Sequence, residues 1–165
     1  MKIGLISDSH DHVPHIEQAV KIFKDEQVDL VIHSGDFCSP FTVPPFEGVQ
    51  LMGLFGNNDG DRYLLMQKFS DIGAEMKGDF FELEVEGRKL AVYHGNYAPI
   101  THALRTCGAY DAVISGHTHE KVLKHFEDTL AINPGTAHGF GEEASIALLE
   151  VETLQVRFIT LDKSP

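Results

Sequence analysis

The sequence has no tryptophan, only two cysteines, and about half as many basic residues as acidic ones, 13 Lys and Arg against 25 Asp and Glu. Two cysteines, Cys38 and Cys107, are too few for the disulfide framework of a secreted domain, so we expect reduced thiols. The formal net charge of −12 leaves no basic surface for non-specific binding of nucleic acid or of an anionic membrane.

Long apolar runs are also missing. The N-terminal segment MKIGLISDSH is broken by Ser7 and Asp8, which is too early for a signal peptide or a membrane span. We therefore expect a cytoplasmic protein. The 165 residues contain no repeat or linker-like stretch, and they predict a single domain spanning 1–165.

Strand and helix signals alternate in the first half of the chain, and strands dominate the second half. Apolar residues at helical spacing predict helices over 16–23, 65–72 and 100–107. Apolar or β-rich runs predict strands at 2–7, 29–33, 49–55, 80–85, 89–94, 112–115, 121–126, 129–132, 145–151 and 155–161. This order predicts an α/β (α+β) fold with a mixed sheet or two packed sheets and the helices outside.

Five of the predicted strands run into short polar loops, and four of these loops contain glycine. The loops are Asp8-Ser9-His10, Gly35-Asp36, Gly56-Asn57-Asn58-Asp59, His94-Gly95 and Gly116-His117-Thr118-His119. Ligands of open α/β sheets bind outside the carboxyl ends of the strands, so roughly parallel strands would bring all five loops to one crevice.

Imidazole and carboxylate groups bind divalent metals, and the supply in these loops exceeds the three or four ligands of one zinc site. Two adjacent metals that share a carboxylate would account for it. Each loop alone has an ordinary explanation: Asp-x-His can cap a helix, and Gly-Asp can form a turn. Five such loops in one chain favour the metal site.

These motifs, in this order, resemble those of the calcineurin-like metallophosphoesterases. The short chain and Asn133-Pro134-Gly135-Thr136 are similar to the small YfcE-type phosphodiesterases. The resemblance covers nearly the whole chain. It implies a four-layer αββα sandwich with two mixed β-sheets, the metallophosphoesterase fold, and a two-metal centre at one sheet edge.

The resemblance also implies which residues bind metal. Asp8, His10, Asp36 and His119 would hold one ion, and Asp36, Asn57, His94 and His117 would hold the other. Two divalent ions are implied, with Mn²⁺ or Ni²⁺ favoured and Fe, Co²⁺ or Zn²⁺ as alternatives. The implied activity is hydrolysis of a small phosphodiester by a hydroxide that bridges the metals.

Asn58 marks a departure from the broader family, which usually has histidine at this place. An asparagine can donate a hydrogen bond to phosphate, but it cannot act as a general acid. Asn58 therefore favours diesters with good leaving groups. Asn58 and Asp59 are the predicted catalytic residues, with Asp59 orienting its neighbours.

Other polar side chains near the motifs have competing interpretations. Arg62 and His12 are predicted substrate contacts, although each could simply belong to the start of a helix. His33, inside a strand, is predicted to be a core residue, and His15 to be surface or half-buried. His138 follows the Asn-Pro-Gly-Thr segment and could line the pocket.

Two other functions stay open. One is a protein-interaction scaffold, as in the retromer subunit with a similar fold, which lacks an intact metal site. All seven metal-ligand positions are filled here. A phosphomonoesterase is disfavoured by Asn58. A homodimer is compatible with the size of the domain, but no apolar stripe indicates one.

Overall fold

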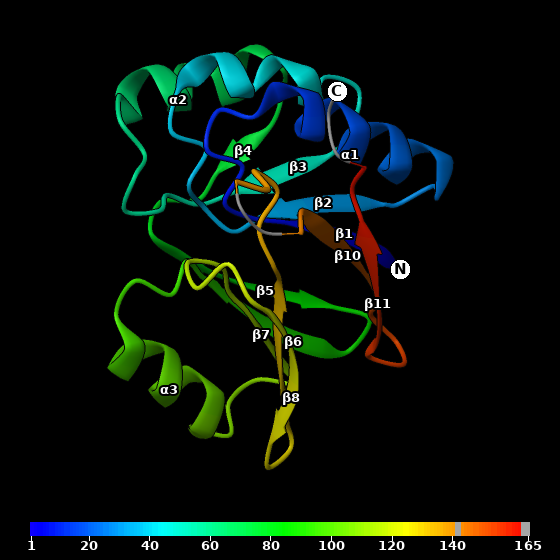
Figure 1. Ribbon diagram of the computed structural model, residues 1–165. Helices are drawn as coiled ribbons and strands as arrows, with labels where there is room; N and C mark the ends of the chain where they lie inside the picture. The colour runs from blue at the N-terminus through cyan, green and yellow to red at the C-terminus, as the bar shows by residue number, and fades with distance from the viewer. Residues whose placement is uncertain (141–142, 163–165) are drawn as a thin grey trace.

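The structure is a computed structural model that describes residues 1–140 and 143–162. Two β-sheets pack face to face, with helices on the outside of each, as Figure 1 shows. Helices α1 (Val13–Asp25) and α2 (Arg62–Asp71) cover one sheet, and α3 (Ala98–Thr106) covers the other. The predicted four-layer αββα sandwich with two mixed sheets is confirmed.

The first sheet has six strands in the order β11-β10-β1-β2-β3-β4. Neighbours among β1 to β4 are parallel, whereas β10 is antiparallel to both β1 and β11. The strands are β1 (Lys2–Ile6), β2 (Leu30–His33), β3 (Leu51–Gly53), β4 (Glu75–Met76), β10 (Ser145–Glu150) and β11 (Gln155–Thr160). The parallel part places the ends of β1, β2 and β3 at one edge.

The second sheet has five strands in the order β5-β6-β7-β9-β8. The central strands β6, β7 and β9 are parallel, and the outer strands β5 and β8 are antiparallel to their neighbours. The strands are β5 (Phe80–Val85), β6 (Arg88–Tyr93), β7 (Ala112–Ile114), β8 (Lys121–Phe126) and β9 (Thr129–Pro134).

Side-chain alternation along β1 explains how the two core layers form. Ile3 and Leu5 point into the layer between the sheets, whereas Ile6 belongs to the layer under the helices. Gly4 also faces the helices, and an added Cβ there would lie 2.6 Å from the ring of Phe23 on α1. The helix therefore packs directly on the backbone of β1.

The predicted strands and helices all occur, with small differences at their ends. The sequence analysis missed the two-residue strand β4 and two short 3-10 helices, η1 (Pro40–Thr42) and η2 (Pro44–Phe46). No helix among the described residues is long and apolar enough to cross a membrane.

Candidate metal centre

The predicted metal ligands lie together between the two sheets, in loops that follow five strands. Asp8, His10, Asp36 and Asn57 come from loops after β1, β2 and β3, and His94, His117 and His119 from loops after β6 and β7. No single sheet carries the whole set. The structure thus brings all seven residues to one place.

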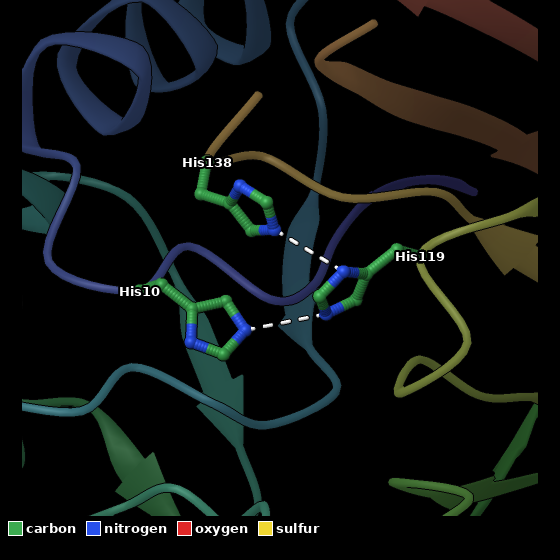
Figure 2. A group of neighbouring side chains, drawn as sticks. All are labelled: His10, His119 and His138. Carbon is green, nitrogen blue, oxygen red and sulfur yellow. Dashed lines mark hydrogen bonds between the residues drawn. The ribbon is translucent and has the colours of Figure 1, made fainter. Parts of the chain in front are cut away.

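One half of the cluster surrounds Asp8. The ligand atoms of Asp8, His10 and Asp36 lie within 4.8 Å of one another. His10 Nε2 lies 3.6 Å from Asp36 Oδ2, and His119 Nε2 lies 3.4 Å from Asp8 Oδ1. The Nε2 atoms of His10 and His119 are 3.3 Å apart, and Figure 2 shows the two rings turned toward each other. Two imidazoles and two carboxylates therefore face one point.

The other half surrounds His94. Its Nε2 lies 3.3 Å from Asp36 Oδ2 and 3.1 Å from Asn57 Oδ1. Its Nδ1–H donates to the carbonyl of Ser34 at 2.8 Å, which fixes the tautomer and leaves Nε2 for the cluster. The ring of His117 packs edge-on against that of His94, with centroids 5.2 Å apart.

Asp36 and His94 shift each other's pKa. Burial opposes ionisation of Asp36, but hydrogen bonds from His94 and Asn58 outweigh it and hold the pKa of Asp36 well below its usual range. Burial also opposes the charged form of His94, and the contact with Asp36 outweighs it and raises the pKa of His94. Asp36 is therefore an anion at neutral pH.

The carboxylates fit a metal site because no Lys or Arg among the described residues pairs with them. The side chain of Asp8 is fully buried and that of Asp36 is 1% exposed. Within 1–140 and 143–162, their only ion-pair partners are histidines, with no Lys or Arg. Buried carboxylates are costly without a cation, so this donor set suits divalent metal ions.

The backbone of the site is held in an unusual conformation. Five of the seven predicted ligands have positive φ: Asp8 (53°), His10 (40°), Asp36 (61°), His117 (67°) and His119 (60°). Left-handed backbone is uncommon in non-glycine residues and costs free energy. Such strain is retained where surrounding structure enforces it, and here it directs side chains toward the cluster.

Glycines permit the close approach of the loops. A Cβ on Gly56 would lie 2.1 Å from Asp36 Oδ1, and one on Gly116 would lie 1.9 Å from Ser7 Oγ and 2.6 Å from Asp8 Oδ2. Both positions therefore require glycine.

Asn58 and Asp59 lie beside Asp36, but they act on different groups. Asn58 donates from its backbone N–H and from Nδ2 to the two carboxylate oxygens of Asp36, both at 2.8 Å. Asp59 is buried and accepts from the backbone N–H groups of Asp36, Cys38 and Gly56, at 3.2, 2.8 and 2.7 Å. Asp59 thus ties the loop after β2 to the loop after β3.

The two predicted substrate contacts have other partners in the structure. His12 caps α1, where its Nδ1 accepts from the backbone N–H of His15 at 3.3 Å. Arg62 pairs with Asp79 at 3.0 Å and lies over the ring of Phe55, at 4.6 Å from its centroid. Their contact with substrate stays a prediction.

Two other histidines test the sequence analysis. His33 is fully buried and contacts Ser9 Oγ at 3.0 Å, which confirms the prediction of a core residue. The prediction that His15 is surface or half-buried is wrong, because only 5% of it is exposed. Its ring nitrogens face the carbonyl oxygens of Ala137 and Asp162, at 2.7 and 3.0 Å, and this long-range contact left no local signal.

His138, which the sequence analysis left as a possible pocket residue, lies directly against the predicted metal ligands. Its Nε2 lies 3.2 Å from His119 Nδ1, and the ligand atoms of His138, His119 and His10 form a second compact group (Figure 2). Cys38 also touches the site, with Sγ 3.3 Å from His10 Nδ1. Burial raises the pKa of the Cys38 thiol to about 12, so it is not a nucleophile at neutral pH.

Comparison with known proteins agrees with this geometry. The chain is 40% identical to "Phosphodiesterase MJ0936" of Methanocaldococcus jannaschii, over 98% of this chain and all of the relative. It is 31% identical to a "Probable metallophosphoesterase" of Methanothermobacter thermautotrophicus, over 82% of this chain and 77% of the relative.

Solved structures show the same fold. An archaeal phosphodiesterase superposes with a TM-score of 0.92 at 40% identity, covering 98% of this chain and all of that one. YfcE of E. coli gives 0.73 at 18% identity over 98% of this chain and all of that one. Zinc-bound Vps29 of Entamoeba histolytica gives 0.64, also at 18%, over 98% and 99%. The last two show the fold alone.

The family described as "Calcineurin-like phosphoesterase superfamily domain" matches residues 1–154. The predicted family and the prediction of an enzyme are confirmed. With this match, the relatives and the donor cluster together, the chain belongs to the calcineurin-like phosphoesterase superfamily.

Proposed function

We propose that this protein is a phosphodiesterase that works with two divalent metal ions. Asp8, His10, Asp36 and His119 would hold one ion, and Asp36, Asn57, His94 and His117 the other. The observation that carries the proposal is the pair of buried carboxylates, Asp8 and Asp36, whose only ion-pair partners among the described residues are imidazoles. A relative named as a phosphodiesterase, 40% identical over the full length, supports the same reaction.

Bound metal ions at such a site activate the attacking water and offset negative charge on the phosphate oxygens. The protein's own residues supply the frame. Asp36 remains ionised at neutral pH and is common to both donor sets. His94 presents Nε2 because Ser34 holds its Nδ1, and Asp59 fixes the backbone of both neighbouring loops.

Asn58 sets the substrate preference in this proposal. Its side-chain amide lies against Asp36, where it can donate a hydrogen bond to a phosphate oxygen, but it carries no proton that it could give to a leaving group. Substrates that need no protonation of the leaving oxygen are therefore favoured. These are activated phosphodiesters rather than alkyl phosphomonoesters.

The proposal is tested by metal analysis combined with a matched pair of substrates. Protein stripped with a chelator is reloaded with Mn²⁺ or Ni²⁺, and turnover of bis(p-nitrophenyl) phosphate is compared with that of p-nitrophenyl phosphate. We expect two bound ions per chain and faster cleavage of the diester. Faster cleavage of the monoester would indicate a phosphomonoesterase. Folded, loaded protein without turnover on several diesters would leave the scaffold interpretation.

A further inference from the structure

In three histidines of the metal centre, Nδ1 contacts a polar partner outside the cluster, while Nε2 faces the cluster. The groups that hold them are the Ser34 carbonyl for His94 (2.8 Å), Cys38 Sγ for His10 (3.3 Å) and His138 Nε2 for His119 (3.2 Å). A histidine that binds metal through one nitrogen usually has the other fixed by such a partner. His138 occupies this position for His119.

His138 is fixed relative to the carboxylates as well. Its backbone N–H donates to the carbonyl of Asp8 at 3.1 Å, and the hydroxyl of Thr136 donates to the same carbonyl at 3.0 Å. The residue is only 6% exposed. The backbone of His138 is thus bonded directly to that of Asp8, which ties the position of His138 to the loop that carries this carboxylate.

We propose that His138 is a positioning residue for the metal site formed by Asp8, His10, Asp36 and His119. In the metal-loaded site it would accept a hydrogen bond from His119 Nδ1–H and thereby keep the lone pair of His119 Nε2 directed toward the carboxylates. This inference rests on the proposed two-metal function, and it adds a residue outside the seven predicted ligands.

The proton count of His138 gives the proposal a second consequence. The backbone N–H of Phe140 points at His138 Nδ1, at 2.7 Å. A neutral imidazole has one N–H, so His138 cannot accept at both nitrogens. When His119 Nε2 binds a metal ion, the proton of that ring is on Nδ1, and His138 must accept at Nε2. The proton of His138 then moves to its own Nδ1, and the bond from Phe140 is lost.

The first test is the affinity for the metal ion alone. Mn²⁺ is titrated calorimetrically into the metal-free wild type and into the variants His138→Ala, His138→Gln and His125→Ala. We expect His138→Ala to weaken one of the two binding events by about 10- to 100-fold. Gln can accept from His119 through its side-chain oxygen, so His138→Gln should recover most of the affinity. His125 is exposed on β8 and serves as the matched control.

Unfolding of each metal-free variant is measured in parallel, so that a general loss of stability is distinguished from a loss of affinity. Affinity within twofold of wild type for His138→Ala would overturn the proposal, as would equal losses for the Ala and Gln variants. If wild type itself bound no metal, the proposed function would fail first. If wild type bound two ions and His138→Ala also bound them normally, only this inference would fail.

The second test reads the proton directly. Nitrogen-15 NMR distinguishes the two neutral tautomers of histidine, and Zn²⁺ is a diamagnetic probe. We expect the proton of His138 on Nε2 in metal-free protein and on Nδ1 in Zn²⁺-loaded protein. An unchanged tautomer on loading would contradict the proposed acceptor role.

Discussion

The two sheets contribute different chemistry to the metal centre. Loops of the six-stranded sheet supply both carboxylates, Asp8 and Asp36, whereas loops of the five-stranded sheet supply only imidazoles. Both anionic donors thus come from one side of the sandwich, together with His10 and Asn57, and the other side adds three imidazoles. The site therefore depends on the packing of the two sheets, because neither sheet alone has a complete donor set.

The hydrogen bonds within the six-stranded sheet also differ in kind from the contacts between the two sheets. Within the six-stranded sheet, neighbouring loops are joined by backbone hydrogen bonds, from Asp8 N to the Gly35 carbonyl at 3.0 Å and from His10 N to the Asp36 carbonyl at 3.1 Å. Contacts between the sheets at the site instead involve side chains, as where the His117 N–H donates to Asp8 Oδ2 at 3.0 Å and where His94 Nε2 lies 3.1 Å from Asn57 Oδ1. Backbone hydrogen bonds within the six-stranded sheet thus fix the loops of Asp8 and Asp36, and the loops of the five-stranded sheet pack against them.

Replacing the carboxylate that joins the two sides should have the largest effect. Asp36→Asn keeps the size of the side chain but removes the charge shared with His94 and His10. We expect turnover to fall by more than about 100-fold, since residues that merely support a ligand already cost 10- to 100-fold. Metal content and diester hydrolysis are measured on the same sample. Full activity with two bound ions would refute the role of Asp36.

Crowding the contact between the sheets should have the next largest effect. In Gly116→Ala, the new Cβ would collide with Ser7 and Asp8 across the interface. We expect the free energy of unfolding to fall by about 1–3 kcal/mol and metal affinity to fall with it. Urea unfolding of metal-free protein measures the first quantity and metal titration the second. Wild-type values for both would show that the sheets have room to separate here.

Removing the ion pair between Asp111 and Arg88 in the five-stranded sheet should have the smallest effect. Asp111 accepts from the backbone N–H of Lys89 and from Arg88, both at 2.8 Å, and these contacts lower the pKa of Asp111. Its stabilising contribution is therefore present above the ordinary Asp pKa and is lost as the pH falls through the lowered folded value. We expect it to be under about 1 kcal/mol, because the pair is partly exposed.

Asp111→Asn should accordingly reduce stability at neutral pH and flatten its decline in acid. Urea unfolding of both proteins at a series of pH values measures the difference. The metal centre lies at the other end of the strands, so diester turnover provides the control. Parallel stability curves for the two proteins would rule out a lowered Asp111 pKa.

The sequence predicted the strands well, because each is a short apolar or β-rich run. The assignment of the donor residues as metal ligands stays a prediction. The sequence could not order the strands in two sheets, since pairing depends on contacts far apart in the chain. The resemblance to a known family implied two mixed sheets, but not the order of the strands within them. The strand β4 was missed because two residues, Glu75 and Met76, carry no periodicity.

Residues that act through distant partners were the hardest to interpret. His15 and His138 lie in polar stretches that look like ordinary surface. Their partners, the Ala137 carbonyl and His119 Nδ1, are 122 and 19 residues away. No local pattern distinguishes such a histidine from an exposed one, so only the fold reveals its role.

The position of Asp36 also has a thermodynamic consequence. Under the proposed assignment this one carboxylate belongs to both metal positions, and Asn58 already bonds to both of its oxygens. The two positions are then energetically linked. Occupancy of either one changes the affinity of the other, and by reciprocity the factor is the same in both directions.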